Sequence, residues 1–388
     1  MWYSLGTFLK NKIFLKIFYG CFGIENALRV QLGATKRASK ENNSYYKGEE
    51  LARFVLYKNI VIVKEYGVQV MDRAGKMIGL RWAQDRRIYG KNVGIVCFDT
   101  GVAAEHPDFN YNGKIVAFKD FVNGKISCYD DNGHGTHVAG IASGTGRASE
   151  GLYCGVAPES HLIVLKILDY KGGGNIEDVL NGVEWVLKNK SKYNIRVANI
   201  SIGTGKEEHI SEDSELVHGV NALWDAGIVV CVAAGNNGPE PGSIGAPGIS
   251  RKVITIGACD DNQAVFLNGK TMKNYSGRGP TQFCIKKPDL VAPGSNITSC
   301  SYIWNTKNGF GVKKFQGQNN GYYTVKSGTS MATPIVSGTV ALLLGKYPEM
   351  TNREVKIRLK KSAEDLGLPH AVQGWGKVNV KDLFFGKM

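Results

Sequence analysis

The sequence predicts an α/β fold built on a doubly wound, mostly parallel β-sheet, in three layers with helices on both faces. Two observations carry this prediction. Short, continuously apolar runs recur between residues 93 and 258, as expected of strands that are buried on both faces. Stretches with apolar residues at helical spacing lie between these runs, and this alternation is typical of parallel sheets.

The predicted strands are rich in Val, Ile and other apolar residues. In chain order they span residues 93–98, 162–168, 197–201, 228–234 and 253–258. Ligands of such sheets bind beyond the carboxyl ends of the strands. The residues that follow each strand are therefore the first candidates for function.

Two predicted helices show an apolar face and recognisable ends. Residues 175–189 form the clearer one, with Asn175 as its cap and Asp178 three places later as a capping partner. The other spans 214–226 and ends before Gly227, where a glycine commonly terminates a helix.

A third helix is predicted from the apolar run 334–344, which follows the stretch SGTSMATP at 327–334. Ser330 would lie at the start of this helix, where backbone N–H groups and the helix dipole stabilise negative charge. A serine there is either a nucleophile or a helix cap, and this stretch alone leaves both interpretations open.

The composition fits one large domain with a basic extension. The chain has 388 residues, 43% of them hydrophobic, and a formal net charge of +14. Residues 1–78 hold 13 Lys and Arg against 6 Asp and Glu. We therefore predict an N-terminal extension over 1–78, a candidate prosegment, and a main domain over 79–388. The basic residues lack the motif context of nucleic-acid-binding proteins, so no nucleic-acid partner is expected.

The cysteines and the N-terminus bear on the compartment. None of the eight cysteines forms a C-x-x-C pair, which argues against a zinc ribbon, and their placement fits a reducing compartment, although pairing stays open. The apolar patch 13–23 is interrupted by Lys16 and makes a poor signal peptide. No apolar run is long enough to span a membrane. We expect a cytoplasmic protein, with secretion as the alternative.

Polar residues with complementary chemistry follow the predicted strands. Asp99 follows the first strand, and Asn236 comes soon after the fourth. His134 stands between two glycines at the start of a helical stretch. Nearby His137 raises a metal interpretation, but no H-E-x-x-H motif or suitably spaced carboxylate accompanies it, so no metal site is predicted. An acid, an imidazole and Ser330 on one rim favour nucleophilic catalysis.

Four blocks carry a family resemblance. IVCFDTGV, DDNGHGTHVAG, AAGNNG and SGTSMATP, in this order, resemble the Asp, His, oxyanion-Asn and Ser blocks of the subtilisin-like serine proteases, over about residues 80–388. Within that family the chain is most similar to the intracellular, AprX-like bacterial branch. The resemblance implies a serine endopeptidase with Asp99, His134 and Ser330 as its triad, in the order known for subtilisin, whose mechanism is that of the family. It also implies that Asn236 donates to the oxyanion, where the alternative role is to hold a glycine turn.

The resemblance further implies how a peptide substrate binds. Two backbone segments would flank an extended substrate, and small residues would wall and floor the pocket for the residue before the cut. The segments are Ser201-Ile202-Gly203 and Gly172-Gly173-Gly174, and the pocket residues are Ala233, Ala234, Gly235 and Gly245. A deep apolar pocket predicts preference for large apolar side chains. Asn237 stands where many relatives have Glu, which weakens attraction for basic residues.

The family pattern also sets expectations for cofactors and regulation. No cofactor is required for catalysis. The Asn-rich loop that binds structural calcium in many secreted members is not recognisable, although Asp108 matches one ligand, so calcium stays an open alternative rather than an expectation. Prosegments in this family often assist folding and block the site, and residues 1–78 are the candidate for such autoinhibition.

Two other functions remain as alternatives. The same fold could support an esterase-type hydrolase, for which the strand-binding glycine segments would have no purpose. It could also serve as a catalytically idle binding protein, against which the four intact chemical positions argue.

Overall fold

The computed structural model describes residues 15–17, 62–64, 73–110, 113–203, 213–267, 269–302 and 321–385. The chain divides into two compact units, Met1–Gly67 and Val68–Met388. In the first unit, β1 (Leu15–Ile17) pairs antiparallel with β2 (Ile62–Lys64). The rest of the predicted extension up to residue 72 lies outside the described residues, so its role as a prosegment stays a prediction.

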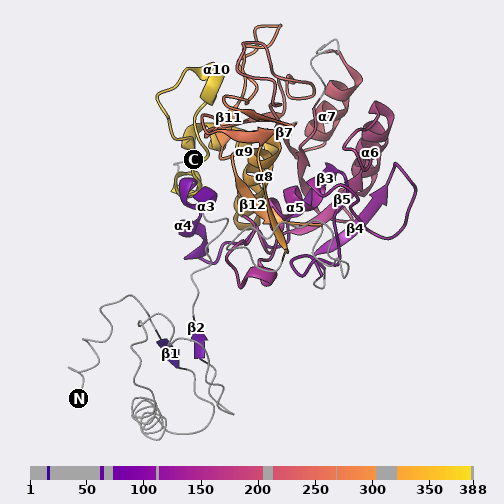
Figure 1. Ribbon diagram of the computed structural model, residues 1–388, viewed down its shortest axis with the longest axis vertical. Helices are drawn as coiled ribbons and strands as arrows, with labels where there is room; N and C mark the ends of the chain where they lie inside the picture. Colours follow the sequence, from indigo (N-terminus) through magenta and orange to yellow (C-terminus); the bar gives the residue numbers. More distant parts are fainter. Residues whose placement is uncertain are drawn as a thin grey trace, which may run out of the picture. The chain divides into compact units, whose positions relative to one another are not determined.

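A seven-stranded sheet forms the centre of the larger unit (Figure 1). Every neighbouring pair of its strands is parallel, which confirms the predicted fold class. The spatial order is β11 (Leu290–Ala292), β8 (Ile254–Ala258), β7 (Val229–Ala233), β6 (Ile195–Ile200), β3 (Gly94–Asp99), β5 (His161–Lys166) and β4 (Ile115–Asp120).

The strand order reverses around β3. The chain runs outward from β3 to β4, returns to β5, and then crosses to β6 on the other side of β3. Crevices at such switch points, beyond the carboxyl ends of the strands, are where ligands bind in this class of sheet. Asp99 is the last residue of β3 and therefore lies at this point.

Helices cover both faces of the sheet. α5 (His134–Ser143) packs against α8 (Thr329–Lys346), and α6 (Ile176–Asn189) packs against α7 (Glu215–Asp225). A side chain at Gly182 of α6 would meet the ring of Phe98, whereas one at Gly135 of α5 would meet Asp99. Because successive side chains of a strand point to opposite faces, α5 and α6 lie on opposite faces of the sheet.

The helix ends behave as the sequence predicts. Asn175 caps α6 by accepting a hydrogen bond of 2.7 Å from the backbone N–H of Asp178. Gly227, just beyond α7, has a φ of 87°, the left-handed conformation that favours glycine. α8 is buried on all sides from Met331 to Leu344, and it packs against both the sheet and α5. Among the helices that the structure describes, none has the length and apolar character needed to cross a bilayer.

The remaining elements surround this core. The hairpin of β12 and β13 contacts α5 and leads through residues 327–328 into α8. The bounds are α3 (Arg73–Met77), α4 (Arg81–Gln84), η2 (Arg147–Ser149), β9 (Val265–Leu267), β10 (Lys270–Met272), β12 (Ile297–Cys300), β13 (Tyr323–Lys326), α9 (Asn352–Ser362), α10 (His370–Gln373) and α11 (Val380–Phe385).

The larger unit begins before the boundary expected from the sequence. Arg73 of α3 forms an ion pair of 2.6 Å with Asp260 and also donates to the backbone carbonyl of Ser295. Residues 73–78 therefore belong structurally to the larger unit. The boundary after residue 78 stays a prediction about where the catalytic domain begins.

Candidate active site

The acid and the imidazole are in direct contact. Nδ1 of His134 lies 2.7 Å from Oδ1 of Asp99, and the same oxygen accepts a hydrogen bond of 2.8 Å from the backbone N–H of Thr100. The Asp99 side chain is 1% exposed and the His134 side chain 25% exposed. The carboxylate is thus shielded from water, while the imidazole reaches the surface.

A second carboxylate holds this pair in place. Asp130 accepts hydrogen bonds from the hydroxyls of Thr100 (2.9 Å) and Thr136 (2.6 Å) and from the backbone N–H of Gly133 (2.8 Å). It thereby ties the residue after β3 to the first turn of α5. Asp130 had no role predicted from the sequence, although its place in DDNGHGTH was a signal.

Gly135 permits the close approach of α5 to β3. A Cβ atom at this position would lie 2.1 Å from the carbonyl oxygen of Gly101 and 3.0 Å from Oδ1 of Asp99. Both distances are shorter than a van der Waals contact, so a larger residue would push the helix away. The glycine after His134 is therefore a condition for the contact between His134 and Asp99.

The two histidines of α5 have opposite electrostatics. Burial by itself lowers the pKa of His134, but the Asp99 carboxylate outweighs burial, and the pKa is raised above its ordinary value. Burial lowers the pKa of His137 to about 3. Nε2 of His137 lies 3.0 Å from the carbonyl oxygen of Ile297 and must donate to it, so His137 is a neutral structural residue.

Ser330 is the second residue of α8 and is linked to the end of β6. Its hydroxyl donates to the carbonyl oxygen of Ser201 at 3.1 Å, and the Ser201 hydroxyl donates to the carbonyl oxygen of Ser330 at 3.1 Å. The structure, over its described residues, contains no hydrogen bond between Ser330 and His134. Catalytic hydrogen bonds of this kind commonly tighten only when substrate binds.

Asn236 lies beside the start of α8. Its Oδ1 accepts hydrogen bonds from the backbone N–H of Thr329 at 2.9 Å and from the Thr329 hydroxyl at 3.1 Å. Since a backbone N–H can only donate, the atom facing it is the amide oxygen, which leaves Nδ2 as a donor. A Cβ atom at Gly328 would lie 3.2 Å from that Nδ2, so the donor lies next to the turn that precedes Ser330. Thr329 had no role predicted from the sequence.

The predicted pocket residues come together after β7. The backbone N–H of Gly245 donates to the carbonyl oxygen of Ala234 at 3.3 Å, and a Cβ atom at Gly235 would lie 3.7 Å from that N–H. A Cβ atom at Gly203 would lie 3.7 Å from the carbonyl oxygen of Ala246. Ala233, the last residue of β7, is buried. The structure thus brings the predicted wall and floor together with one of the predicted backbone segments.

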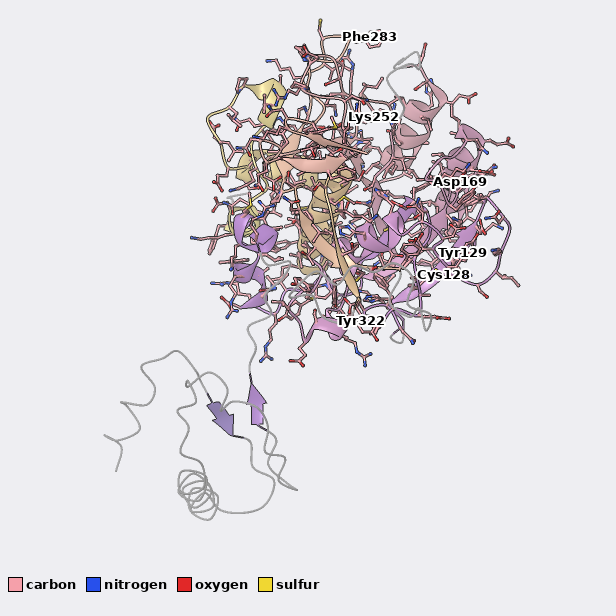
Figure 2. All side chains as sticks on the ribbon, in the orientation of Figure 1. Cys128, Tyr129, Asp169, Lys252, Phe283 and Tyr322 are labelled. Atoms are coloured by element: carbon pink, nitrogen blue, oxygen red, sulfur yellow. The ribbon has the colours of Figure 1, made fainter. Side chains whose placement is uncertain are left out.

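The other predicted segment follows β5. Asp169, which Figure 2 labels, lies at the start of the loop that contains this segment. The Asp169 carboxylate accepts a hydrogen bond of 2.9 Å from the backbone N–H of Gly173. A Cβ atom at Gly172 would lie 3.6 Å from Nδ2 of Asn132, two residues before His134. Ser201-Ile202-Gly203 follows β6, on the other side of β3. The two predicted segments therefore follow the strands on either side of Asp99.

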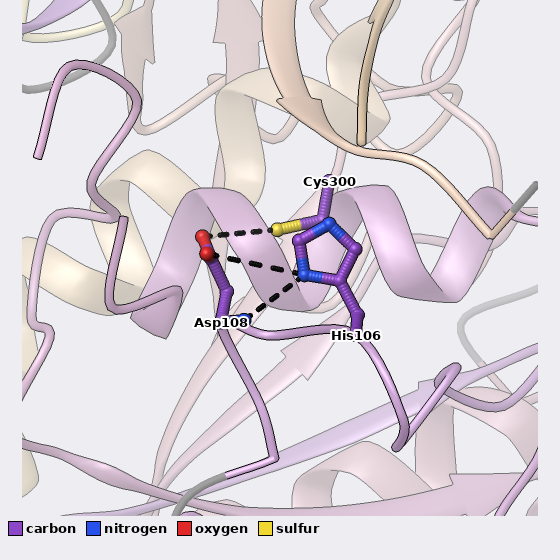
Figure 3. Close-up of side chains that lie close together, drawn as sticks. All are labelled: His106, Asp108 and Cys300. Carbon is purple, nitrogen blue, oxygen red and sulfur yellow. Dashed lines mark hydrogen bonds and ion pairs between the residues drawn. The ribbon is translucent and has the colours of Figure 1, made fainter. Parts of the chain in front are cut away.

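The residue that matches a calcium ligand belongs to a buried cluster with His106 and Cys300 (Figure 3). The Asp108 carboxylate accepts hydrogen bonds from the backbone N–H of Gly146 at 2.9 Å and from the hydroxyl of Tyr323 at 3.0 Å. The thiol of Cys300 lies 3.4 Å from Oδ2, and burial raises its pKa well above the ordinary value.

This donor set does not fit calcium. Ca²⁺ takes six to eight oxygen ligands, and here one carboxylate is accompanied by a thiol and an imidazole. Nδ1 of His106 already accepts the backbone N–H of Asp108 at 3.1 Å, and its Nε2 lies 2.8 Å from the carbonyl oxygen of Tyr322. The polar atoms of His106, Asp108 and Cys300 form hydrogen bonds with one another and with neighbouring groups. The cluster therefore joins segments that are distant in the sequence.

Comparison with known proteins places the chain in one family. The sequence model of the subtilase family matches residues 90–376. The serine protease AprX of Bacillus subtilis is 43% identical over 288 residues, which is 71% of this chain and 62% of AprX. Subtilisin DY of Bacillus licheniformis is 34% identical, over 75% of this chain and 90% of its own.

Solved structures agree with these sequence matches. The S41 psychrophilic protease superimposes with a TM-score of 0.60 and 30% identity, over 75% of this chain and 92% of its own. Sphericase superimposes with a TM-score of 0.59 and 29% identity over the same shares. The chain spans less than two thirds of AprX but nearly all of the shorter subtilisins that it matches. It therefore belongs to the subtilase family of subtilisin-like serine proteases and lies close to the AprX branch of that family.

Proposed function

We propose that this chain is a serine endopeptidase that hydrolyses peptide bonds through an acyl-enzyme, with Asp99, His134 and Ser330 as the catalytic triad. The single observation that carries the proposal is the 2.7 Å contact between Nδ1 of His134 and Oδ1 of Asp99. This contact lies at the carboxyl end of β3, on the face of the sheet where α5 and α8 pack together. Membership of the subtilase family supports the same assignment.

The mechanism is the one established for subtilisin, and the residues of this chain fit its roles. Oγ of Ser330 attacks the scissile carbonyl carbon while Nε2 of His134 accepts the hydroxyl proton. The imidazolium then gives this proton to the leaving amine, and the acyl group stays on Ser330. Water repeats the sequence and releases the acid. Asp99 stabilises the imidazolium, which agrees with the raised pKa of His134.

The oxyanion would be stabilised by two donors. The backbone N–H of Ser330 lies in the first turn of α8, where N–H groups have no intrahelical acceptor. The second donor is Nδ2 of Asn236, which donates to no acceptor among the described residues, while Oδ1 faces Thr329. Both donors belong to the protein before substrate arrives, so no reorganisation is required as charge develops on the oxygen.

We propose that substrates bind as an extended strand and that a large apolar side chain precedes the cut. The pocket after β7 is built from alanine and glycine, with Gly235 beside Gly245. A panel of peptides with Phe, Leu, Lys or Glu before the scissile bond tests this preference. We expect the highest kcat/KM for Phe and Leu, and fastest cleavage after Lys would contradict the assignment of the pocket.

The alternatives predict different patterns of turnover. An esterase-type hydrolase would cleave activated esters but not casein, and a catalytically idle binding protein would cleave neither. A serine endopeptidase cleaves both, and Ser330→Ala abolishes both activities. Casein and ester hydrolysis, measured on the same folded wild-type and variant proteins, therefore decide among the three.

Four further predictions accompany this proposal. We propose catalysis without a cofactor, because the triad supplies both nucleophile and base. We propose a cytoplasmic protein, with secretion as the alternative, and the seven described cysteines, all free, support a reducing compartment. Autoinhibition by residues 1–78 and the expected lack of nucleic-acid binding remain predictions from the sequence.

A further inference from the structure

A lysine stands close to the catalytic pair. Lys326 is the last residue of β13, four residues before Ser330. It lies opposite Ile297 in the pairing of β13 with β12. Nε2 of His137 donates to the carbonyl oxygen of Ile297 at 3.0 Å. The end of this hairpin is therefore fixed against α5 within one helical turn of His134.

The ammonium group of Lys326 is partly buried, and no counter-ion for it lies in the part of the chain that the structure describes. Burial lowers the pKa of Lys326 below its ordinary value, and the nearby carboxylates of Asp130 and Asp99 offset this effect only in part. Over the residues that the structure describes, Lys326 forms neither an ion pair nor a hydrogen bond. A partly desolvated cation without a partner is energetically unfavourable, and an anionic ligand would relieve this penalty.

Three of the four oxygens of the neighbouring carboxylates accept hydrogen bonds, and the fourth, Oδ2 of Asp99, is buried without a hydrogen-bond partner and forms no ion pair with Lys326 among the described residues. Oδ1 of Asp99 accepts from His134 and Thr100. Both oxygens of Asp130 accept hydrogen bonds, Oδ1 from the Thr100 hydroxyl and Oδ2 from the Thr136 hydroxyl. These acids attract Lys326 electrostatically without pairing with it. No group of the described residues pairs with the cation, so an acidic group of a bound peptide can do so.

The position of Lys326 determines which part of a substrate it meets. The segments and pocket assigned to residues before the cut follow β5, β6 and β7. Lys326 belongs instead to the β12–β13 hairpin, which packs against α5, the helix that begins with His134. An extended peptide that leaves the pocket and passes Ser330 would continue toward this hairpin. The residues after the scissile bond are therefore the ones that approach Lys326.

We propose that Lys326 forms a subsite for an acidic side chain at one of the first two positions after the scissile bond. This inference rests on the proposed function and specifies its substrates. The residues assigned to the pocket before the cut, Ala233, Ala234, Gly235 and Gly245, carry no charge, so Lys326 supplies a charge selection that these residues lack. A glutamate would pair with the ammonium, a glutamine would leave it unpaired, and a lysine would be repelled.

The test compares peptides that differ only in this charge. Internally quenched peptides carry Phe before the cut and Glu, Gln or Lys at each of the two following positions, and kcat/KM is measured for each. We expect the wild-type enzyme to prefer Glu over Gln by about tenfold at one position, which corresponds to about 1.4 kcal/mol. The preference should decrease as salt screens the charges.

Variants locate the effect. Lys326→Gln should reduce the ratio of Glu to Gln peptides to about one, Lys326→Arg should preserve a preference for Glu, and Lys326→Glu should favour Lys peptides. Lys188→Gln is the matched control, because Lys188 lies exposed on α6 and pairs with Glu184, away from the site. The ratio compares two substrates of one protein sample, so it does not depend on how much of a variant folds.

Three results would overturn the inference. A wild-type ratio near one at both positions, with all peptides cleaved, contradicts the role of Lys326 and leaves the proposed function intact. A tenfold ratio that persists in Lys326→Gln assigns the selection to another residue. If the folded wild-type protein cleaves no peptide and does not react with a fluorophosphonate, the proposed function fails, and the inference fails with it.

Discussion

The oxyanion donor offers the sharpest prediction about a single side chain. Asn236→Ala removes Nδ2, the proposed oxyanion donor, and Oδ1, which accepts the hydrogen bonds from Thr329. Without Nδ2 the developing oxyanion keeps only the backbone donor of Ser330. Loss of the equivalent donor in subtilisin lowers kcat by about 10²–10³, or about 2.7–4 kcal/mol, and that known case sets the magnitude expected here. KM should change little, because the donor acts mainly in the transition state.

The structure also predicts what the substitution does to stability. Asn236 accepts two hydrogen bonds from Thr329, and a net contribution of about 1 kcal/mol for each predicts a loss of about 1–2 kcal/mol in unfolding free energy. Thr329→Val is the matched comparison, since it removes the hydroxyl that orients the amide but keeps Nδ2. Its kcat should decrease less than that of Asn236→Ala.

The assay combines kinetics with unfolding on the same samples. kcat and KM are measured with a chromogenic peptide at saturating and limiting concentrations, and urea unfolding reports the folded fraction. A folded Asn236→Ala protein with kcat within about threefold of the wild type would refute the role of Asn236 in the oxyanion hole, since loss of such a donor lowers kcat by about 10²–10³. A large increase in KM at constant kcat would assign the amide to substrate binding instead.

Two further predictions concern pH and folding. Catalysis needs a neutral His134, so activity should decrease as the pH falls through its pKa, and because Asp99 raises that pKa the midpoint should lie above the ordinary value of about 6.5. Asp99→Asn should shift this midpoint to lower pH and reduce kcat by about 10⁴, and an unshifted pH profile would argue against the pair. Arg73→Met should lower the unfolding free energy by about 1–3 kcal/mol, because the buried Asp260 carboxylate loses its cation. Arg81→Met is the control: it breaks the exposed ion pair with Asp85 and should change the unfolding free energy by less than about 1 kcal/mol. Equal losses in urea unfolding of the two arginine variants would contradict a structural role for α3.

The sequence was most informative where the backbone is regular and buried. The runs that form β3, β5, β6, β7 and β8 were predicted to within a residue or two, because strands covered on both faces are continuously apolar. The two strands at the edges of the sheet were missed. β4 is only partly buried and contains Lys119, so it shows no apolar run, and β11 is three residues long between Pro288 and Pro293.

The candidate site divides in a similar way. Asp99, His134, Asn236 and Ser330 could be predicted because each follows a strand or begins a helix inside a recognisable motif. Asp130 could not be assigned a role, because its function lies in hydrogen bonds to segments whose proximity only the fold establishes.

Some roles depend entirely on contacts between distant segments. Asp108 matches a calcium ligand in sequence, but in the fold its carboxylate is satisfied by Tyr323 and by the backbone of Gly146. Thr329 orients Asn236 across a separation of 93 residues. Lys326 becomes notable only when its burial and its lack of a counter-ion among the described residues are visible, since a single lysine carries no pattern in the sequence.

The central claim is that Ser330 is a nucleophile activated by His134, and active-site labelling tests it most directly. A fluorophosphonate reacts with an activated serine, and mass spectrometry of the digested protein locates the adduct. We predict one adduct on Ser330 in the wild-type protein and none in folded Ser330→Ala or His134→Ala. A folded wild-type protein without an adduct on Ser330, or a Ser330→Ala protein that still hydrolyses casein, would contradict the account.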